Sequence, residues 1–328
     1  MEILGSTFDD SVFEESRNKV SSVLPTYNAK FCEPEWFCED ADTEDVLEKQ
    51  KAFKFRADLA YRRKQYQTAL NDYTSCLSFV PDGNLSIRRD VLEGMVRCCC
   101  QLGRREQAQE LTEKLRKEAS NTCHLTCVLQ MDLSIAEHFG DPIASIAALQ
   151  QLCSLHPFNP WHWHKLASVC HALLDTDCAT PSPSASLTNP IAGALSQEAG
   201  TAPVEQQRDE RELWLKACVG FIRTRLLIAI LRIQQSSFVL QTSERVVLEA
   251  DDALQQLQPS ESTVQIIAQV MSEDLNPEKM REENQDGESL AGLAGRDFEE
   301  RWWYRLVCAG LLQKERVNVT NEGTQATS

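Results

Sequence analysis

Apolar residues recur at helical spacing on either side of a short polar turn between positions 53 and 81. The second half of this stretch carries an apolar stripe made of Tyr66, Leu70, Tyr73 and Leu77. Small residues, Ala57 and Ala69, stand where two antiparallel helices would touch. Pro81 should end the second helix because its ring removes a backbone donor. The pattern predicts a helical hairpin, which needs a neighbour of the same kind to bury its second face.

Two later stretches repeat the pattern, and a fourth begins it. Residues 90–115 and 124–157 each contain a glycine at the expected turn, Gly103 and Gly140. The packing position of Ala69 recurs at Ala108 and Ser145, with separations of 39 and 37 residues. A fourth opening helix is indicated over 159–175 by the helical spacing of Trp163, Leu166, Ala167 and Cys170.

These units resemble the tetratricopeptide repeat (TPR) family. The first unit matches its pattern of aromatic, small and closing proline positions best, through Phe53, Ala57, Tyr66, Ala69, Tyr73 and Pro81. The spacing exceeds the family's usual length of about 34 residues, which leaves room for longer loops. The resemblance implies an all-α fold: an α-solenoid of TPR-like helical hairpins with C-terminal capping helices.

Several segments also resemble a vertebrate protein family of unassigned function. They include FDDSVFEE, AKFCEPEWF, LHPFNPWHW and ACVGFIRTRLL. The likeness covers most of the chain except residues 175–208 and the C-terminal tail, and it implies no activity.

The predicted organisation has seven parts. They are an acidic arm bearing aromatic residues (1–50), the repeats (51–175), a disordered linker rich in Pro, Ser and Ala (176–208), helices that complete or cap the array (209–275), a loop (276–295), a C-terminal helix (296–315) and a disordered tail (316–328). The first helix of the array is expected to start at Asp45 to Leu47.

The N-terminal arm is strongly acidic, with 13 acids and 4 bases in residues 1–50. It also carries large apolar side chains, which a solvated acidic tail does not need: Phe8, Val12, Phe13, Tyr27, Phe31, Trp36 and Phe37. Residues 51–171 carry a net charge of +3. Two interpretations remain open: the arm docks along the repeats, or its aromatic residues await another protein.

Charge and hydropathy exclude some classes of function. The formal net charge of −16 argues against nucleic-acid binding, which needs clustered Lys and Arg. The most apolar run, residues 226–231, is too short to span a bilayer, so no membrane partner is expected. The first residues lack a signal-peptide pattern. The 13 cysteines are therefore expected to be reduced thiols of an intracellular protein in cytoplasm, nucleus or both.

Catalytic and metal-binding patterns are incomplete. The chain has no G-x-S-x-G elbow and no glycine-rich phosphate loop, so it is not expected to be an enzyme or to hold a cofactor. Cys123 and Cys127 lie one helical turn apart, but the second pair that a zinc site needs is absent as a compact motif. Cys98, Cys99 and Cys100 are expected to be structural thiols in a packed helix.

Partner-binding residues are expected on the first helices of the first two units: Lys54, Asp58, Tyr61, Arg62 and Arg97. Trp302 and Trp303 would point about 100° apart on a helix, so one should be an exposed anchor, and Trp302 is included as a candidate. A chaperone-type carboxylate clamp is not expected. An acid, Asp58, replaces its amide, and the third unit offers Gln130 and Ser134 in place of its cations.

The function expected from these features is a non-catalytic scaffold or adaptor that holds a partner's extended or acidic segment in a TPR-like groove. Two alternatives stay open. One is a zinc-binding or redox-sensing protein that uses the Cys/His-rich residues 123–171. The other is an obligate subunit of a larger complex.

Overall fold

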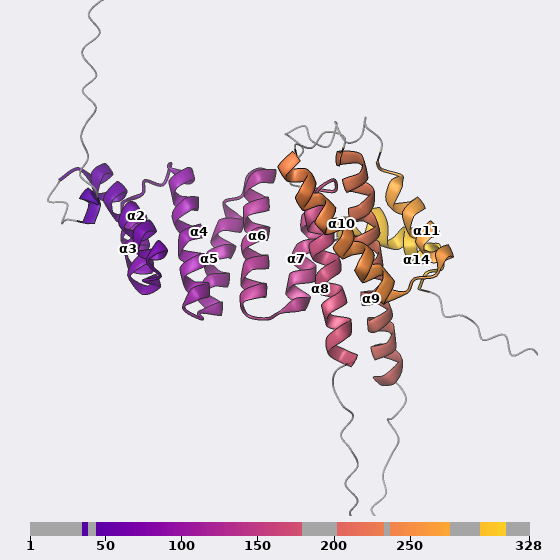
Figure 1. Ribbon diagram of the computed structural model, residues 1–328. Coiled ribbons are helices and arrows are strands. Elements are labelled where there is room, and N and C mark those ends of the chain that lie inside the picture. Colours follow the sequence, from indigo (N-terminus) through magenta and orange to yellow (C-terminus); the bar gives the residue numbers. More distant parts are fainter. Residues whose placement is uncertain (1–34, 39–43, 179–201, 233–236, 276–295, 313–328) are drawn as a thin grey trace, which may run out of the picture.

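A computed structural model describes residues 35–38, 44–178, 202–232, 237–275 and 296–312 (Figure 1). These residues form helices and turns without a strand, which confirms the all-α prediction for this part of the chain. The elements are η1 (Trp36–Cys38), α2 (Val46–Arg62), α3 (Tyr66–Phe79), α4 (Leu85–Gln101), α5 (Arg105–Lys117), α6 (Thr122–His138), α7 (Pro142–Leu155), α8 (Pro160–Cys178), α9 (Ala202–Leu231), α10 (Ser237–Leu257), α11 (Glu261–Ser272), α13 (Arg296–Phe298), the π-helical turn η3 (Glu299–Trp303) and α14 (Tyr304–Cys308).

The helices pack in neighbouring pairs that follow the chain order. Helix α2 packs on α3, α4 on α5, α6 on α7 and α8 on α9, and the second helix of each of the first three pairs packs on the first helix of the next. Figure 1 shows these pairs side by side from α2 to α9. The three predicted hairpins are present, and α9 pairs with the fourth opening helix.

The turns inside the first three pairs have one geometry. Lys64, Gly103 and Gly140 have φ angles of 61°, 71° and 66°, in the left-handed region. The residue after each of them donates its N–H to the carbonyl of the residue five positions earlier. These hydrogen bonds join Gln65 to Ala60, Arg104 to Cys99 and Asp141 to Ala136, at 2.8–2.9 Å. This is the Schellman helix ending, in which a left-handed residue satisfies the last carbonyls of a helix. The turns are separated by 39 and 37 residues, the same spacing as the packing residues.

Small residues set the distance between helices. Ala57, Ala69 and Ala108 are fully buried. A Cβ atom on Gly94 of α4 would lie 2.6 Å from the ring of Tyr73 on α3, so only glycine permits this approach. A Cβ atom on Gly220 of α9 would lie 2.8 Å from the Trp163 carbonyl of α8.

The helices extend into the predicted linker from both sides. Helix α8 continues to Cys178, and α9 begins at Ala202, so the predicted bounds 176–208 are too wide. Pro203 lies in the first turn of α9, where the missing N–H of a proline has no intrahelical partner to lose. The rest of that segment, the predicted loop 276–295 and the predicted tail 316–328 lie outside the described residues.

The C-terminal helix is shorter than predicted. It ends at Cys308, because Gly310 adopts φ 85° and Leu311 donates its N–H to the Leu306 carbonyl at 3.4 Å. This is the same ending as in the repeats. The prediction of a helix through residue 315 is wrong because it treated Gly310 as an interior residue.

A second core unites the C-terminal helices. Helices α10 and α11 both pack on α9, α13 packs on α7, and α14 packs on α11. The rings of Trp163 on α8 and Trp302 on η3 lie 5.0 Å apart at 85°. This core therefore joins residues that are far apart in sequence.

Candidate functional site

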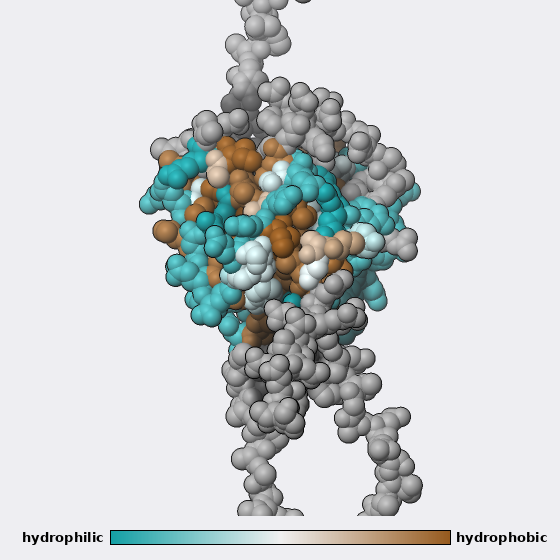
Figure 2. All heavy atoms as spheres, turned by 90° about the vertical axis from the view of Figure 1, so that its right-hand side faces the viewer, coloured by the Kyte–Doolittle hydropathy of each residue, from teal (hydrophilic) through white to brown (hydrophobic). Residues whose placement is uncertain are grey.

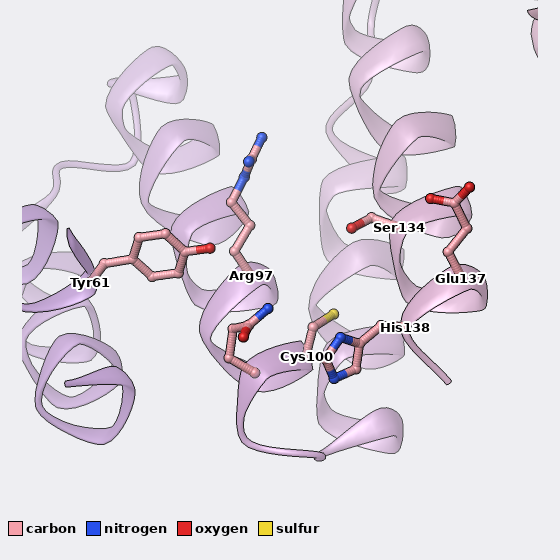
Figure 3. A pocket seen from close by; sticks show the side chains of 7 residues that line it. Tyr61, Arg97, Cys100, Ser134, Glu137 and His138 are labelled. Atoms are coloured by element: carbon pink, nitrogen blue, oxygen red, sulfur yellow. The ribbon is translucent and has the colours of Figure 1, made fainter. Parts of the chain in front are cut away.

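A pocket of about 340 Å³ opens on the face formed by α2, α4 and α6, the first helices of the first three pairs (Figure 3). We call it the repeat pocket. Its lining residues are Tyr61, Arg97, Cys100, Gln101, Ser134, Glu137 and His138. Figure 3 shows Tyr61 pointing from α2 towards Arg97, with Ser134, Glu137 and His138 across the pocket on α6.

The lining residues occupy equivalent positions in successive repeats. Applying the spacings of 39 and 37 residues to Tyr61 gives Cys100 and then Glu137. The same spacings join Asp58 to Arg97 and Ser134, and Arg62 to Gln101 and His138. The three columns recur at i, i+3 and i+4, so they share one helix face. The pocket is thus lined by equivalent positions of successive repeats.

Donors and acceptors of both charges meet in the repeat pocket. Arg97 donates to Glu93 at 2.6 Å, and this hydrogen bond raises the pKa of Arg97. Glu137 forms an ion pair with Lys165 of α8 at 2.7 Å. Burial raises the pKa of the Tyr61 phenol, which keeps it protonated as a donor. The arrangement suits a polar ligand that offers both donors and acceptors.

Lys54 and Asp58 lie on the face of α2 that carries Tyr61, but they bind neighbouring helices. Lys54 forms ion pairs with Asp58 at 3.0 Å and with Asp90 of α4 at 2.8 Å. Burial alone would lower the pKa of Lys54, but the hydrogen bonds to Asp90 and Asp58 outweigh it and raise the pKa. Asp58 also accepts from the Tyr73 hydroxyl at 2.6 Å. These residues join α2, α3 and α4.

The six predicted site residues do not form one site in the structure. Tyr61 and Arg97 line the repeat pocket. Lys54 and Asp58 are next to it on the same face, and Arg62 is exposed without lining it. Cys100, Gln101, Ser134, Glu137 and His138 were missed as a group. The repeat spacing applied to Tyr61, Asp58 and Arg62 would have found them.

Trp302 is not an exposed anchor, and that prediction is wrong. It is 1% exposed, and its indole N–H donates to Asp274 at 3.3 Å. Trp303 is 9% exposed, with the Lys216 ammonium 5.2 Å from its ring centroid. The two side chains contact different partners, Trp163 for Trp302 and Lys216 for Trp303, because the segment lies between α7 and α11 and is covered on more than one side.

A buried arginine organises the same region. Arg223 of α9 has no exposed surface, and it donates to Asp274 at 2.5 Å and to the carbonyls of Met271 and Pro157. Burial lowers the pKa of Arg223, and the Asp274 carboxylate opposes that shift. Asp274 also accepts from Arg301 and Trp302. The network joins α9, α11, η3 and the α7–α8 connection.

The three thiols of α4 have the properties of packing residues. Cys98, Cys99 and Cys100 are all buried, and burial raises the pKa of Cys98 to about 12. Cys123 and Cys127 are exposed, and partial burial raises the pKa of Cys127. Over the described part of the chain, no three His, Cys, Asp or Glu side chains are grouped so that they could hold a metal ion.

Part of the N-terminal arm contacts the first hairpin. The rings of Trp36 and Phe37 lie 6.3 and 5.8 Å from that of Phe55 on α2, and Glu35 pairs with Arg63 at 2.6 Å. Phe55 does not line the repeat pocket. Residues 1–34, with the other predicted docking residues, lie outside the described part, so docking along the repeats stays a prediction.

None of the helices described combines the length and the apolar character needed to cross a bilayer.

Comparisons with known proteins find a family and relatives without an assigned activity. A model described as "Family of unknown function (DUF5588)" matches residues 2–192 and 182–307. The "Uncharacterized protein C8orf76" of Homo sapiens is 34% identical, over 93% of each chain. The "Uncharacterized protein C8orf76 homolog" of Rattus norvegicus is 32% identical, also over 93% of each chain. The expected resemblance to a vertebrate protein of unassigned function is confirmed, and no solved structure matches.

Proposed function

We propose a non-catalytic function for this chain, which belongs to the family of unknown function DUF5588: it is a scaffold or adaptor that binds a partner's extended segment along the α2–α4–α6 face. The observation that carries the proposal is the repeat pocket. Equivalent positions of three successive hairpins converge on it, as in an α-solenoid that presents a continuous binding surface. We infer that the array is a TPR-like solenoid from its hairpin order, its small contact residues and its repeated turns.

The pocket chemistry fits a peptide. An extended backbone presents N–H and C=O groups in alternation, and the pocket offers the Tyr61 hydroxyl, the Gln101 amide and the Ser134 hydroxyl as partners. Arg97 has five N–H groups, and its pairing with Glu93 leaves donors for an acidic side chain of the partner. Arg97 is thus the residue that would select an acidic position.

The proposal also accounts for the thiols. The eleven cysteines whose side chains the structure describes are free, which fits an intracellular protein in cytoplasm, nucleus or both. Cys100 borders the pocket, but burial raises its pKa, so it is not activated as a nucleophile.

The experiment compares partners of the intact protein and two charge-reversed variants. Proximity labelling and affinity purification from cells identify proteins captured by the wild type, and Arg97→Glu should reduce that capture about tenfold or more. Arg245→Glu makes the same charge change on α10 at a strongly exposed position and should leave capture unchanged. Equal capture by all three proteins contradicts the proposal, provided that both variants melt like the wild type.

The two alternative functions have separate tests. Stoichiometric zinc in untagged protein, measured by mass spectrometry, would favour the metal-binding function of residues 123–171. A chain that is stable only when co-expressed with its partner would be an obligate subunit, and its melting temperature would rise on complex formation.

A further inference from the structure

A second, more apolar groove lies on the C-terminal helices, away from the repeat pocket. It has a volume of about 410 Å³ and runs over α9 between α10 and α11. We call it the C-terminal groove. Its apolar lining includes Leu226, Ala229, Val247, Val264 and Ala268. Figure 2 looks onto the C-terminal end of the array and shows apolar side chains reaching the surface between polar ones.

The groove has the form of a site for an amphipathic helix. Its α9 lining runs from Ile222 to Arg232, which is about 15 Å or three turns at 1.5 Å per residue. Three turns are the usual length over which a helix anchors apolar residues in a groove. Leu226 and Val247 are only half-buried, although both are large and apolar. An occupant would remove that surface from water.

The charged residues in the lining are both cationic. Arg225 and Arg232 stand one heptad apart on α9. Each also pairs with an acid of α10, Arg225 with Asp251 at 3.0 Å and Arg232 with Glu244 at 2.7 Å. A guanidinium has five donors, so each arginine can bind a second carboxylate. An acidic, apolar-striped segment is the complementary ligand.

We propose that the occupant is the chain's own N-terminal segment, residues 4–15. A helix would place Leu4, Phe8 and Val12 on one face, at i, i+4 and i+8. Four acids lie in the same segment: Asp9, Asp10, Glu14 and Glu15. The segment therefore offers an apolar stripe to the groove and carboxylates to its arginines.

The chain is long enough for this contact within one molecule. Residues 16–34 separate the segment from Glu35, which contacts Arg63 beside α2. These 19 residues span up to about 65 Å when extended. Seven helix-to-helix steps lead from α2 to α9. At 8–10 Å for each step, the distance is at most about 70 Å, which is reached only if all the helices lie in one line. Packing in pairs shortens the path.

The test uses the full chain with a photoreactive p-benzoylphenylalanine in place of Phe8. After irradiation, mass spectrometry should map the cross-links to residues 222–232, 247, 264 or 268 of the same chain. The same group at Tyr27 is the control for non-specific reach of the arm. Ala229→Asp, which puts a like charge into the groove lining, should lower the position-8 cross-link about tenfold. Ile230→Asp, one residue away and outside the lining, should leave it unchanged.

Several outcomes overturn the proposal. Cross-linked dimers would show that a second copy supplies the occupant, and cross-links to the repeat pocket would place the segment on the other surface. Equal cross-linking from positions 8 and 27, or no effect of Ala229→Asp, would show that the segment does not enter the groove. Melting curves of both α9 variants establish that they fold.

Discussion

The two cores of this molecule are built on different principles. The core of α2–α6 contains many small residues, such as Ala57, Ala69 and Cys98, and each helix pair contacts its neighbours in the chain. The core of α7–α14 contains large rings and a buried ion pair, and it joins Trp163 to Trp302. The first has nearest-neighbour stability, as in repeat proteins, and the second depends on distant segments arriving together. Four substitutions test this difference.

The largest effect is expected at the buried ion pair of the second core. Asp274→Ala leaves the Arg223 guanidinium buried without its carboxylate, which should lower the free energy of unfolding by about 3–5 kcal/mol. Amide hydrogen exchange should show protection lost in α8–α14 and kept in α2–α5. Replacing both partners, with Arg223→Met and Asp274→Leu, should recover much of the loss. Equal loss of protection in all helices would show that the two cores unfold as one unit.

A smaller effect is expected from the close helix contact of the first core. Gly94→Ala places a Cβ atom against the Tyr73 ring and should cost about 1–3 kcal/mol in chemical denaturation. Tyr73→Leu in the same chain should relieve the clash in part. Gly83→Ala is the matched control, because nothing lies within 4 Å of its Cβ position. If Gly94→Ala left the stability unchanged, α3 and α4 would be free to move apart.

Acid should weaken the second core through two histidines. His156 and His162 lie 5.8 Å apart between ring centroids, and burial lowers the pKa of both, that of His162 to about 4. The unfolded chain then binds more protons below pH 6.5, so stability is lost as the pH falls from about 6.5 towards 4. The contribution of His162 is about 1–2 kcal/mol after solvent screening.

Denaturant titrations at several pH values check this expectation. His162→Gln should flatten the pH dependence between 6.5 and 4, whereas His138→Gln, which removes an exposed imidazole, should not. Parallel pH curves for the wild type and His162→Gln would exclude the buried pair as the cause.

The smallest expected effect is a gain of stability in the first core. Lys64 has the left-handed φ that Gly103 and Gly140 have in the equivalent turns, which is unfavourable for a residue with a Cβ atom. Lys64→Gly should raise the melting temperature, with a gain of about 0.5–1 kcal/mol. Gly103→Ala should lower the stability by about the same amount. A loss of stability in Lys64→Gly would show that the turns are not equivalent.

The sequence predicted local features better than distant contacts. The order of the hairpins, the small residues at helix contacts and the turn glycines follow from spacing and chain geometry, which act over a few residues. Tyr61 and Arg97, which were predicted from one face of the expected first helices, line the repeat pocket. The burial of Trp302 could not be predicted, because it depends on α7 and α11, which approach from elsewhere in the chain.

The sequence by itself determined that paired helices recur at 39 and 37 residues, with glycines at the second and third turns, because helical periodicity and the backbone freedom of glycine act locally. Only the tertiary structure decided which residues share a pocket and which tryptophans are covered. Those outcomes depend on the order in which distant helices pack, and no spacing within one helix encodes that order. The repeat pocket depends on both. The equivalent positions that line it follow from the repeat spacing, and the packing of the helices brings them together.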